Sequence, residues 1–455
     1  MTAVAAMDVE ELNPDQEIDF CTLGMFILDE IQYPPPKPPQ YNVLGGAGAY
    51  SALGARIVSP APSESKKVGW IVDRGSDFPP SQTALINSWQ TSCLLRTNPS
   101  RLTTRGFNGY DATDPQHRSF HYTTPKLRLS HNDLLDSPVL LHSKSFHLIC
   151  SPSRCISLVT NILSLRRQTL YPLSPPKPLF IWEPVPDLCL PTELLATTAA
   201  LGYVDICSPN HSELGTLMSS PASLPDGSVD RAFVEDAAEM LLASMPLSAV
   251  AIIVRCGADG CYIAQNGGRS APTHPRPTPS STSNLATPAP PPPKKAKKIR
   301  GGGLALTADI DMMSLFADIP SSPPSPTSSS SPDSSPSSSD DHADPPRDFG
   351  LSTWLPPYHT TPDKVLDPTG GGNAFLGALA ITHARGAGLE EAARWGNVAA
   401  SFAIEQVGMP VVGVDEGGGE RWNGVRVGER MEELEGRCKV AGDGGLMGGM
   451  AGLSI

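Results

Sequence analysis

The sequence predicts an α/β fold in which a mostly parallel sheet is covered by helices on both faces. Short apolar runs, each long enough for one buried strand, alternate with longer segments of helical periodicity. Strands of a parallel sheet are buried on both faces, so they read as continuous apolar runs, and their neighbours are joined by helical crossovers. A hydrophobic content of 39% is sufficient for a large core of this kind.

The strands and helices of this fold can be placed along the chain. Buried strands are expected in the apolar runs at 19–24, 68–72, 145–150, 179–182, 203–207 and 250–254, with a further strand at 364–366. Helical patterns predict helices at 45–55, 154–165, 191–201, 231–244, 371–387 and 390–406. The segments 94–97 and 119–122 are shorter and more polar, and we expect them in a small separate sheet, a lid.

The 48 prolines of the chain are concentrated in one region. Residues 265–350 are rich in Pro, Ser, Thr and Gly, a composition that cannot bury enough apolar surface to offset chain entropy. The rest, roughly 370 residues, is close to the size of one large α/β domain. The sequence therefore predicts one domain in two parts, 19–264 and 351–440, with a disordered N-terminus at 1–18 and a Gly-rich tail at 441–455.

Charge and cysteine content exclude several function classes. The formal net charge of −13 argues against a broad surface for nucleic acid or anionic membranes. No apolar run approaches the ~20 residues of a membrane span, and the acidic first residues contain no signal-type apolar core. The nine cysteines are scattered without a metal-ligand pattern, so they are expected to be reduced core residues. We therefore expect a soluble, cytoplasmic protein that binds neither membrane nor nucleic acid.

The predicted insertion has two features of its own. A basic run from Lys294 to Arg300 follows four prolines and has the form of a nuclear-localisation signal. A solvated run of linker charge is the alternative. The acidic, apolar segment 305–319 could bind a protein partner or dock on its own domain.

The stretch from Asp367 to Asn373 carries the strongest functional signal. Three consecutive glycines, Gly370, Gly371 and Gly372, precede a helical run of small and apolar residues. A glycine turn that opens a helix directs free backbone N–H groups at one point, which suits an anion such as a phosphate. Asp367 is expected to cap this turn.

This stretch resembles the second signature of the ribokinase or pfkB-type carbohydrate kinases, Asp-Thr-x-Gly-Ala-Gly-Asp. The resemblance implies a ribokinase-like three-layer fold with a small β lid, and phosphoryl transfer from ATP with Mg²⁺ to a hydroxyl of a sugar or nucleoside. In that family the last Asp takes the proton of the acceptor hydroxyl, and here Asn373 occupies its position. A neutral amide cannot accept a proton near pH 7.

Two motifs near the N-terminus match the acceptor site of the family. Asp29 follows Gly24 by five residues, where the family has an Asp that holds sugar hydroxyls, and a carboxylate accepts two such hydrogen bonds. A solvated acidic loop is the alternative. Gly45 and Gly46 open the first signature of the family, but Tyr50 replaces the Asn that touches the sugar. This change argues against ordinary sugar recognition.

Two motifs farther along match the nucleotide site of the family. Asn210 and Glu213 correspond to its Asn-x-x-Glu, which arranges Mg²⁺ mainly through water, and oxygen ligands suit that ion. The pair also has the form of a helix N-cap, and the two interpretations are compatible. Arg255, Gly257 and Gly260 match the nucleotide-side hairpin, where Arg255 could bind phosphate or form a salt bridge.

The resemblance covers about residues 19–262 and 361–411 and leaves two functions open. The strings at 103–106, 182–186 and 370–373 are similar to the fungal maintenance-of-killer branch, which itself has Asn at the base position. The protein is either an ATP-dependent kinase for a polyol or nucleoside or a catalytically impaired pseudokinase, a binding or scaffold protein. In the first case Asn373→Asp is expected to speed turnover by roughly ten-fold or more.

Overall fold

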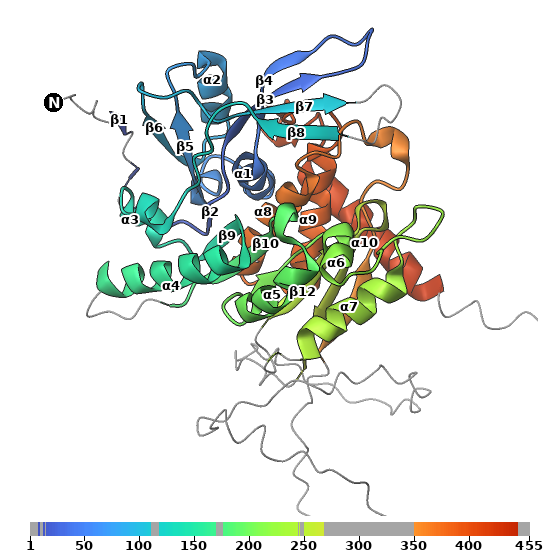
Figure 1. Cartoon of the computed structure of the whole chain (residues 1–455). Coiled ribbons are helices and arrows are strands. Elements are labelled where there is room, and N and C mark those ends of the chain that lie inside the picture. Colours follow the sequence, from blue (N-terminus) through green and yellow to red (C-terminus); the bar gives the residue numbers. More distant parts are fainter. Residues whose placement is uncertain are drawn as a thin grey trace, which may run out of the picture.

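A ten-stranded sheet forms the centre of the protein (Figure 1). The computed structural model describes residues 8–9, 12–13, 15–110, 118–169, 176–243, 245, 250–267 and 350–444. In spatial order the strands are β1 (Asp8–Val9), β6 (Ser92–Thr97), β5 (Val68–Arg74), β2 (Phe20–Thr22), β9 (Ser145–Cys150), β10 (Leu179–Pro184), β11 (Ile206–Cys207), β12 (Ala251–Arg255), β13 (Cys261–Gln265) and β14 (Leu351–Leu355). All neighbours from β6 to β12 are parallel, which confirms the predicted mostly parallel sheet.

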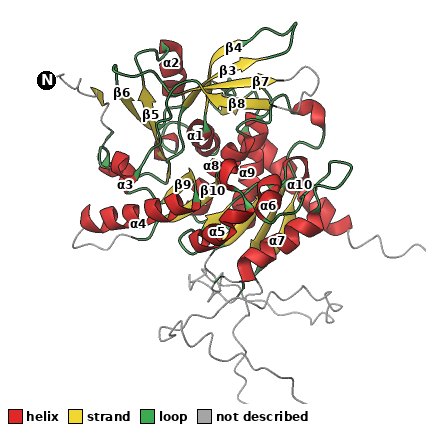
Figure 2. Ribbon diagram, in the orientation of Figure 1, coloured by secondary structure: helices red, strands yellow, loops and turns green. Residues whose placement is uncertain are grey.

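Helices cover both faces of this sheet and complete the predicted three-layer fold (Figure 2). One face carries α1 (Ala47–Ile57), α2 (Pro80–Ser88), α8 (Gly371–Ala384), α9 (Leu389–Ala403) and α10 (Val427–Gly444). The other carries α3 (Pro138–Leu141), α4 (Pro152–Thr169), α5 (Leu194–Leu201), α6 (His211–Leu217) and α7 (Arg231–Ala243). Successive strand side chains point to opposite faces. In β5, Trp70 and Val72 therefore pack into the first core and Ile71 into the second.

A smaller, four-stranded sheet forms the lid, at the top of Figure 1. Its strands are, in order, β4 (Gln40–Gly45), β3 (Ile27–Gln32), β7 (Arg105–Tyr110) and β8 (Arg118–Tyr122). The prediction that 119–122 belongs to the lid is confirmed. The same prediction for 94–97 is wrong, because β6 pairs with β5 in the central sheet and buries Leu94 and Leu95 on its two faces.

The predicted strand at 364–366 is also wrong. A short 3₁₀ helix occupies Pro362–Lys364, and Leu366 is 71% exposed. The backbone N–H groups of Leu366 and Asp367 donate to the carbonyl oxygen of Ile404, at 2.9 and 3.2 Å, instead of to a neighbouring strand. The segment before the glycine turn is thus held by the end of α9, and β14 is the last strand of the central sheet.

The two ends of the predicted insertion meet at the edge of the central sheet. β13 and β14 are antiparallel neighbours, with Gln265 opposite Leu351. Gly350 has a φ of 73°, and a Cβ there would lie 2.6 Å from the backbone nitrogen of Gly267. Residues 268–349 lie outside the described residues, and with them the basic run at 294–300 and the segment 305–319.

Deletion of residues 268–349, with Gly267 joined to Gly350 through an Asn-Gly turn, is expected to leave the domain folded. The turn closes an existing antiparallel pair, and each halving of a loop lowers its closure cost by about 0.6 kcal/mol. The Tm of the deletion variant, measured by circular dichroism, should equal or exceed that of the full chain. A Tm lowered by more than ~2 °C, a loss of about 1 kcal/mol or more for a domain of this size, would show that the deleted segment stabilises the domain.

Three expectations about the whole chain can be compared with the structure. All nine cysteines are unpaired, as predicted, and seven of them are buried. Of the helices in the described ranges, none combines the length and the apolar character that crossing a membrane requires. The predicted terminal segments are described in part: β1 lies within 1–18, and α10 continues into 441–455 as far as Gly444.

Candidate active site

Two glycine turns, each opening a helix, meet beyond the carboxyl ends of the parallel strands. Gly46, before α1, and Gly370, before α8, have φ values of 88° and 80°, a left-handed conformation that favours glycine. The two helices cross so closely that a Cβ at Gly377 would overlap the carbonyl oxygen of Ser51. Small residues in both helices therefore bring the two turns together.

A cavity of about 500 Å³ lies between these turns, the strand ends and the lid. Open α/β sheets bind their ligands in this position, outside the carboxyl ends of the strands. Most of the predicted site residues line the cavity: Asp29, Gly46, Tyr50, Asn210, Glu213, Arg255, Gly257, Gly370, Gly372 and Asn373. The structure therefore brings together residues from five separate motifs.

A second cavity, of about 480 Å³, adjoins the first. Two further predicted residues, Gly260 and Gly371, line only this cavity. The residues that line both cavities are Arg255, Gly257, Pro368 and Gly372. The two cavities thus meet at the first turn of α8.

The last two predicted residues, Gly45 and Asp367, line neither cavity but support residues of the site. A Cβ at Gly45 would overlap the carboxylate of Asp29, so glycine lets that side chain lie against β4. Asp367 is 5% exposed, and its Oδ1 accepts a hydrogen bond of 2.9 Å from the backbone N–H of Thr369. This is the predicted cap of the glycine turn.

Tyr50 lies directly on the glycine turn before α8. A Cβ at Gly370 would overlap the Tyr50 ring, and the tyrosine is 4% exposed. The residue at the position of the family's sugar-binding Asn is therefore a buried aromatic side chain that packs against the glycine turn. Its ring narrows the first cavity on the side of α1.

Asn210 and Glu213 form a complete capping box at the start of α6. The Glu213 Oε2 accepts from the backbone N–H of Asn210 at 2.7 Å, and the Asn210 Oδ1 accepts from the backbone N–H of Glu213 at 2.8 Å. The N-cap interpretation is confirmed, and it directs both side chains to the first cavity. Burial raises the pKa of Glu213, although the charge of Arg255 opposes this.

Arg255, at the end of β12, forms salt bridges with two buried carboxylates. Its Nη1 lies 2.9 Å from Oε1 of Glu183, and its Nη2 lies 3.5 Å from Oε2 of Glu213. A Cβ at Gly372 would overlap Nη1, so the guanidinium lies on the first turn of α8. The Nε is buried and has no hydrogen-bond partner among the described residues, which leaves one donor directed at neither carboxylate.

Glu183, at the end of β10, is a site residue that the sequence motifs did not predict. Its Oε2 accepts a hydrogen bond of 2.6 Å from Nδ2 of Asn373 and lies 3.3 Å from Nε2 of His147. Burial opposes ionisation of this carboxyl, but the charge of Arg255 and the hydrogen bond with His147 outweigh it and lower the pKa. The sequence feature that could have indicated this site residue is a charged side chain at the end of an otherwise apolar strand.

His147 supports Glu183 from the interior of the sheet. The ring is fully buried in β9, and its Nδ1 lies 3.0 Å from the hydroxyl oxygens of both Thr22 and Ser51. Hydroxyl groups can donate to Nδ1, which assigns the ring hydrogen to Nε2, facing Glu183. The buried carboxylate therefore has a donor on each of three sides: an amide, an imidazole and a guanidinium.

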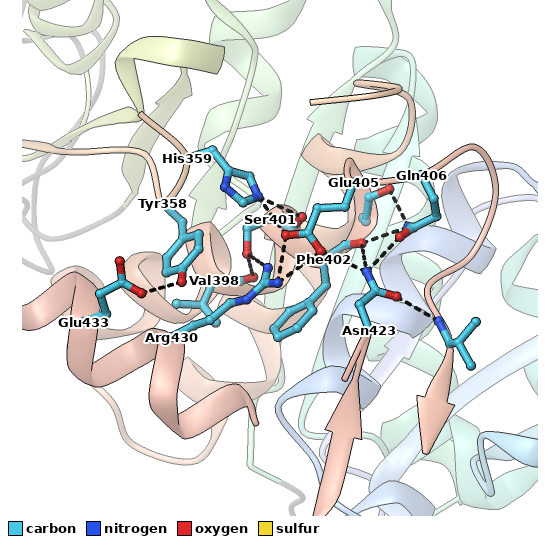
Figure 3. A network of polar contacts seen from close by, with 12 residues as sticks. Tyr358, His359, Val398, Ser401, Phe402, Glu405, Gln406, Asn423, Arg430 and Glu433 are labelled. Carbon is cyan, nitrogen blue, oxygen red and sulfur yellow. Dashed lines mark hydrogen bonds and ion pairs between the residues drawn. The ribbon is translucent and has the colours of Figure 1, made fainter. Parts of the chain in front are cut away.

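Residues on one side of the second cavity belong to a polar network, whose side chains Figure 3 shows. Tyr358, His359 and Ser401 line this side. Oε1 of Glu405 lies 3.1 Å from Nε2 of His359 and 2.7 Å from Nη2 of Arg430, whose Nη1 donates to the Ser401 hydroxyl at 2.7 Å. The network ties the loop after β14 to α9 and α10, and so keeps this side of the cavity in place (Figure 3).

The donor set of the first cavity fits Mg²⁺ held mainly through water and phosphate. Asn210 and Glu213 keep oxygen lone pairs beyond those used in the capping box. In the part of the chain that the structure describes, no group of three or more His, Cys, Asp or Glu side chains could hold a metal ion by itself. Mg²⁺ in phosphate sites uses one or two protein carboxylates and keeps several waters, so a smaller donor set suffices.

Known proteins resemble this chain in sequence and in fold. An uncharacterized protein of Schizosaccharomyces pombe is 30% identical over 420 residues, which are 92% of this chain and 93% of that protein. Protein MAK32 of Saccharomyces cerevisiae is 28% identical over 418 residues, 90% of each chain. The structure of ribokinase from Giardia lamblia matches with a TM-score of 0.55 and 12% identity, over 92% of this chain and 99% of that one.

The signature region has its own match. The sequence model of the pfkB family carbohydrate kinases matches residues 355–411, which contain the glycine turn and the start of α8. The ribokinase likeness, at its low identity, shows the fold alone, and it agrees with the three layers and the lid described above. Together with the two fungal relatives, this match shows that the chain belongs to the pfkB family of carbohydrate kinases, in the fungal branch of Protein MAK32.

Proposed function

We propose that this protein transfers the γ-phosphoryl group of ATP to a hydroxyl of a small polyol or nucleoside. The observation that supports this most is the convergence of ten predicted residues on one cavity, which adjoins a second cavity of similar volume. Phosphoryl transfer requires two ligands to meet end to end, and catalysis depends mainly on their positioning and on charge stabilisation. Two cavities that meet at a helix N-terminus suit that requirement.

The acceptor would lie in the first cavity, beneath the lid. Asp29 of β3 supplies a carboxylate that accepts hydroxyl hydrogen bonds. Tyr50 replaces an amide with an aromatic ring, which favours an acceptor with an apolar face over a small free sugar. Phe120 of the lid strand β8 also lines this cavity, which adds a second aromatic side chain.

The nucleotide would lie across the junction of the two cavities. Free N–H groups at the start of α8 are donors for phosphate oxygens, and the Arg255 guanidinium, which lines both cavities, adds positive charge beside them. Asn210 and Glu213 would hold Mg²⁺, which supplies neutralisation of the phosphate charge when bound. The base and ribose would occupy the second cavity, where Phe375 and Ile404 provide apolar contacts.

A binding function without catalysis is the second candidate. Asn373 replaces the family base, and Arg255 is engaged with two carboxylates at the point where phosphate would bind. Tyr50 and Arg255 both lie on the glycine turn. A protein of this kind would bind nucleotide weakly and would not turn it over.

The nucleotide proposal predicts that ATP·Mg²⁺ raises the Tm of the protein by several degrees. A ligand at one hundred times its Kd stabilises the folded state by about 2.7 kcal/mol. Gly372→Ala should abolish most of this shift, because the new methyl group displaces the Arg255 guanidinium at the phosphate position. The matched control is Gly388→Ala, where a Cβ would meet no atom within 4 Å and the shift should persist.

Thermal unfolding with millimolar ATP·Mg²⁺ is the measurement for all three proteins. Each shift is taken relative to the same protein without nucleotide, so a change in intrinsic stability does not interfere. No shift in the folded wild-type protein would contradict both candidate functions. If ATP does raise the Tm, steady ADP release with an acceptor separates the kinase from the binding protein.

A further inference from the structure

Glu183 restores a carboxylate at the point where the family's base is missing. Asn373 occupies the base position, and its Nδ2 donates to Oε2 of Glu183 at 2.6 Å. Both side chains line the first cavity, where the acceptor hydroxyl would lie. The two residues are 190 positions apart in the chain, so the contact depends on the fold.

The orientation of the Asn373 amide leaves its oxygen available for a ligand. Glu183 is an acceptor when ionised, so the amide must turn its nitrogen to the carboxylate. Oδ1 of Asn373 then faces away from Glu183. A hydroxyl group in the cavity therefore has two acceptors in reach, Oδ1 of Asn373 and the carboxylate of Glu183, and can donate to one while it lies beside the other.

A purely structural role explains Glu183 less well. Burying an ionised carboxylate costs several kcal/mol, and an apolar residue at the end of β10 would avoid that cost. Glu183 is instead held ionised by Arg255, His147 and Asn373, with a side chain 7% exposed that still lines the cavity. The N-terminal end of α8 also favours a negative charge at this place.

We propose that Glu183 is the proton acceptor for the acceptor hydroxyl and that Asn373 positions that hydroxyl. The inference rests on the proposed kinase function. As the O–H bond of the acceptor breaks, its proton passes to the Glu183 carboxylate and its oxygen bonds to the γ-phosphorus. The bond from the γ-phosphorus to the β–γ bridging oxygen breaks, and ADP leaves with that electron pair.

An ion-paired carboxylate of low basicity is adequate for this step. The transition state of phosphoryl transfer is loose in most analyses, so the attacking oxygen has formed little bond and has lost little of its proton. The base then receives the proton late, and its position matters more than its strength. Glu183 is fixed in position on three sides, as that role requires.

The proposal changes the expectation for Asn373→Asp. An aspartate there would place two carboxylates in hydrogen-bond contact, and one of them would have to hold a proton. We therefore expect no gain in turnover from this single change, in contrast to the ten-fold gain expected from the sequence. In the double variant Glu183→Gln/Asn373→Asp the pair keeps one amide and one carboxylate with their positions exchanged.

The test compares the full-length wild-type protein with Glu183→Gln, Asn373→Asp and the double variant. ADP release from ATP·Mg²⁺ is measured with and without a panel of free sugars, sugar alcohols and nucleosides. The ATP-induced shift in Tm is measured for the same proteins, which reports nucleotide binding without turnover. Glu420→Gln is the matched control, because Glu420 is also paired with a buried arginine, Arg56, and lines neither cavity.

The expected result is a loss of ~10²–10⁴-fold in kcat for Glu183→Gln, the usual contribution of a general base. KM and the ATP-induced shift should change little, and Glu420→Gln should keep its kcat. The double variant should recover at least ten-fold over Glu183→Gln. Recovery separates proton transfer from lost ion pairing, because the double variant also lacks the carboxylate that pairs with Arg255.

Four outcomes would overturn the proposal. A kcat for Glu183→Gln within three-fold of the wild type, or a ten-fold gain from Asn373→Asp alone, would show that Glu183 does not take the proton. A double variant as slow as Glu183→Gln would assign the loss to ion pairing. A wild-type protein that binds ATP and releases no ADP with any acceptor would contradict the kinase function itself, and Glu183 would have no reaction to serve.

Discussion

Replacement of Arg255 by methionine is expected to lower the free energy of unfolding by about 3–5 kcal/mol, the usual cost of breaking a buried ion pair from one side. The side chains of Arg255, Glu183 and Glu213 are 13%, 7% and 8% exposed. Without the guanidinium, both carboxylates lose their shared counter-charge while they remain buried. Dissolved salt screens the charges of a buried cluster only weakly, so the loss of stability should persist at high salt.

The loss should also depend on pH. In the wild-type protein the pKa of Glu183 is lowered, so its ion pair stabilises the fold above the ordinary pKa of glutamate and loses this effect as the pH falls. In Arg255→Met burial raises the pKa of both carboxyls. The folded state then binds protons more tightly than the unfolded state, and stability rises as the pH falls.

Urea unfolding at about pH 7.5 and about pH 5 measures both effects. The difference between wild type and Arg255→Met should be largest at the higher pH and should shrink at the lower one. Arg231→Met is the matched control, because Arg231 is 54% exposed and its pair with Asp259 should contribute only about 0–1 kcal/mol. Equal losses in the two variants would contradict the buried cluster described here.

Gly377→Ala is expected to lower the free energy of unfolding by about 1–3 kcal/mol, the cost of overpacking a close contact. The new Cβ would overlap the carbonyl oxygen of Ser51, a backbone atom of α1 that cannot move by itself. The loss should occur although alanine favours a helix by about 1 kcal/mol over glycine. Because the crossing brings the glycine turns of α1 and α8 together, the ATP-induced shift in Tm should also decrease.

The opposite result is expected for Gly436→Ala. Gly436 lies on the exposed side of α10, and a Cβ there would meet no atom within 4 Å. The substitution should stabilise the protein by up to ~1 kcal/mol through helix propensity alone. Chemical unfolding of the two alanine variants therefore isolates the contact between the helices. A similar gain in both would mean that α1 and α8 do not cross at the described distance.

The sequence determined the local chemistry of the candidate site. The glycine turn at 370–372, the capping box of Asn210 and Glu213 and the cap by Asp367 all involve residues within a few positions of one another. Such features depend on backbone conformation and short-range hydrogen bonds, which residue type and spacing specify. The same holds for the buried strands, because a parallel sheet covered on both faces requires apolar runs.

The tertiary structure decided which strands pair. The sequence did not predict β3, β4 and β7 of the lid, and it assigned the residues of β6 to the lid instead of the central sheet. Short strands of mixed polarity are stabilised by their neighbours, and those neighbours are distant in the chain. The segment 364–366 shows the reverse case. It was predicted as a strand from its apolar residues, but the backbone N–H of Leu366 donates to the carbonyl oxygen of Ile404 at the end of α9.

The role of Glu183 was likewise decided only by the fold. The sequence shows a glutamate at the end of an apolar strand and an asparagine at the base position, with no indication that they touch. Folding places β10, β12 and the first turn of α8 side by side, and a carboxylate, a guanidinium and an amide then lie within hydrogen-bond distance. Local spacing determines caps and turns, whereas the ionisation and partners of a buried group depend on charges that only long-range packing brings together.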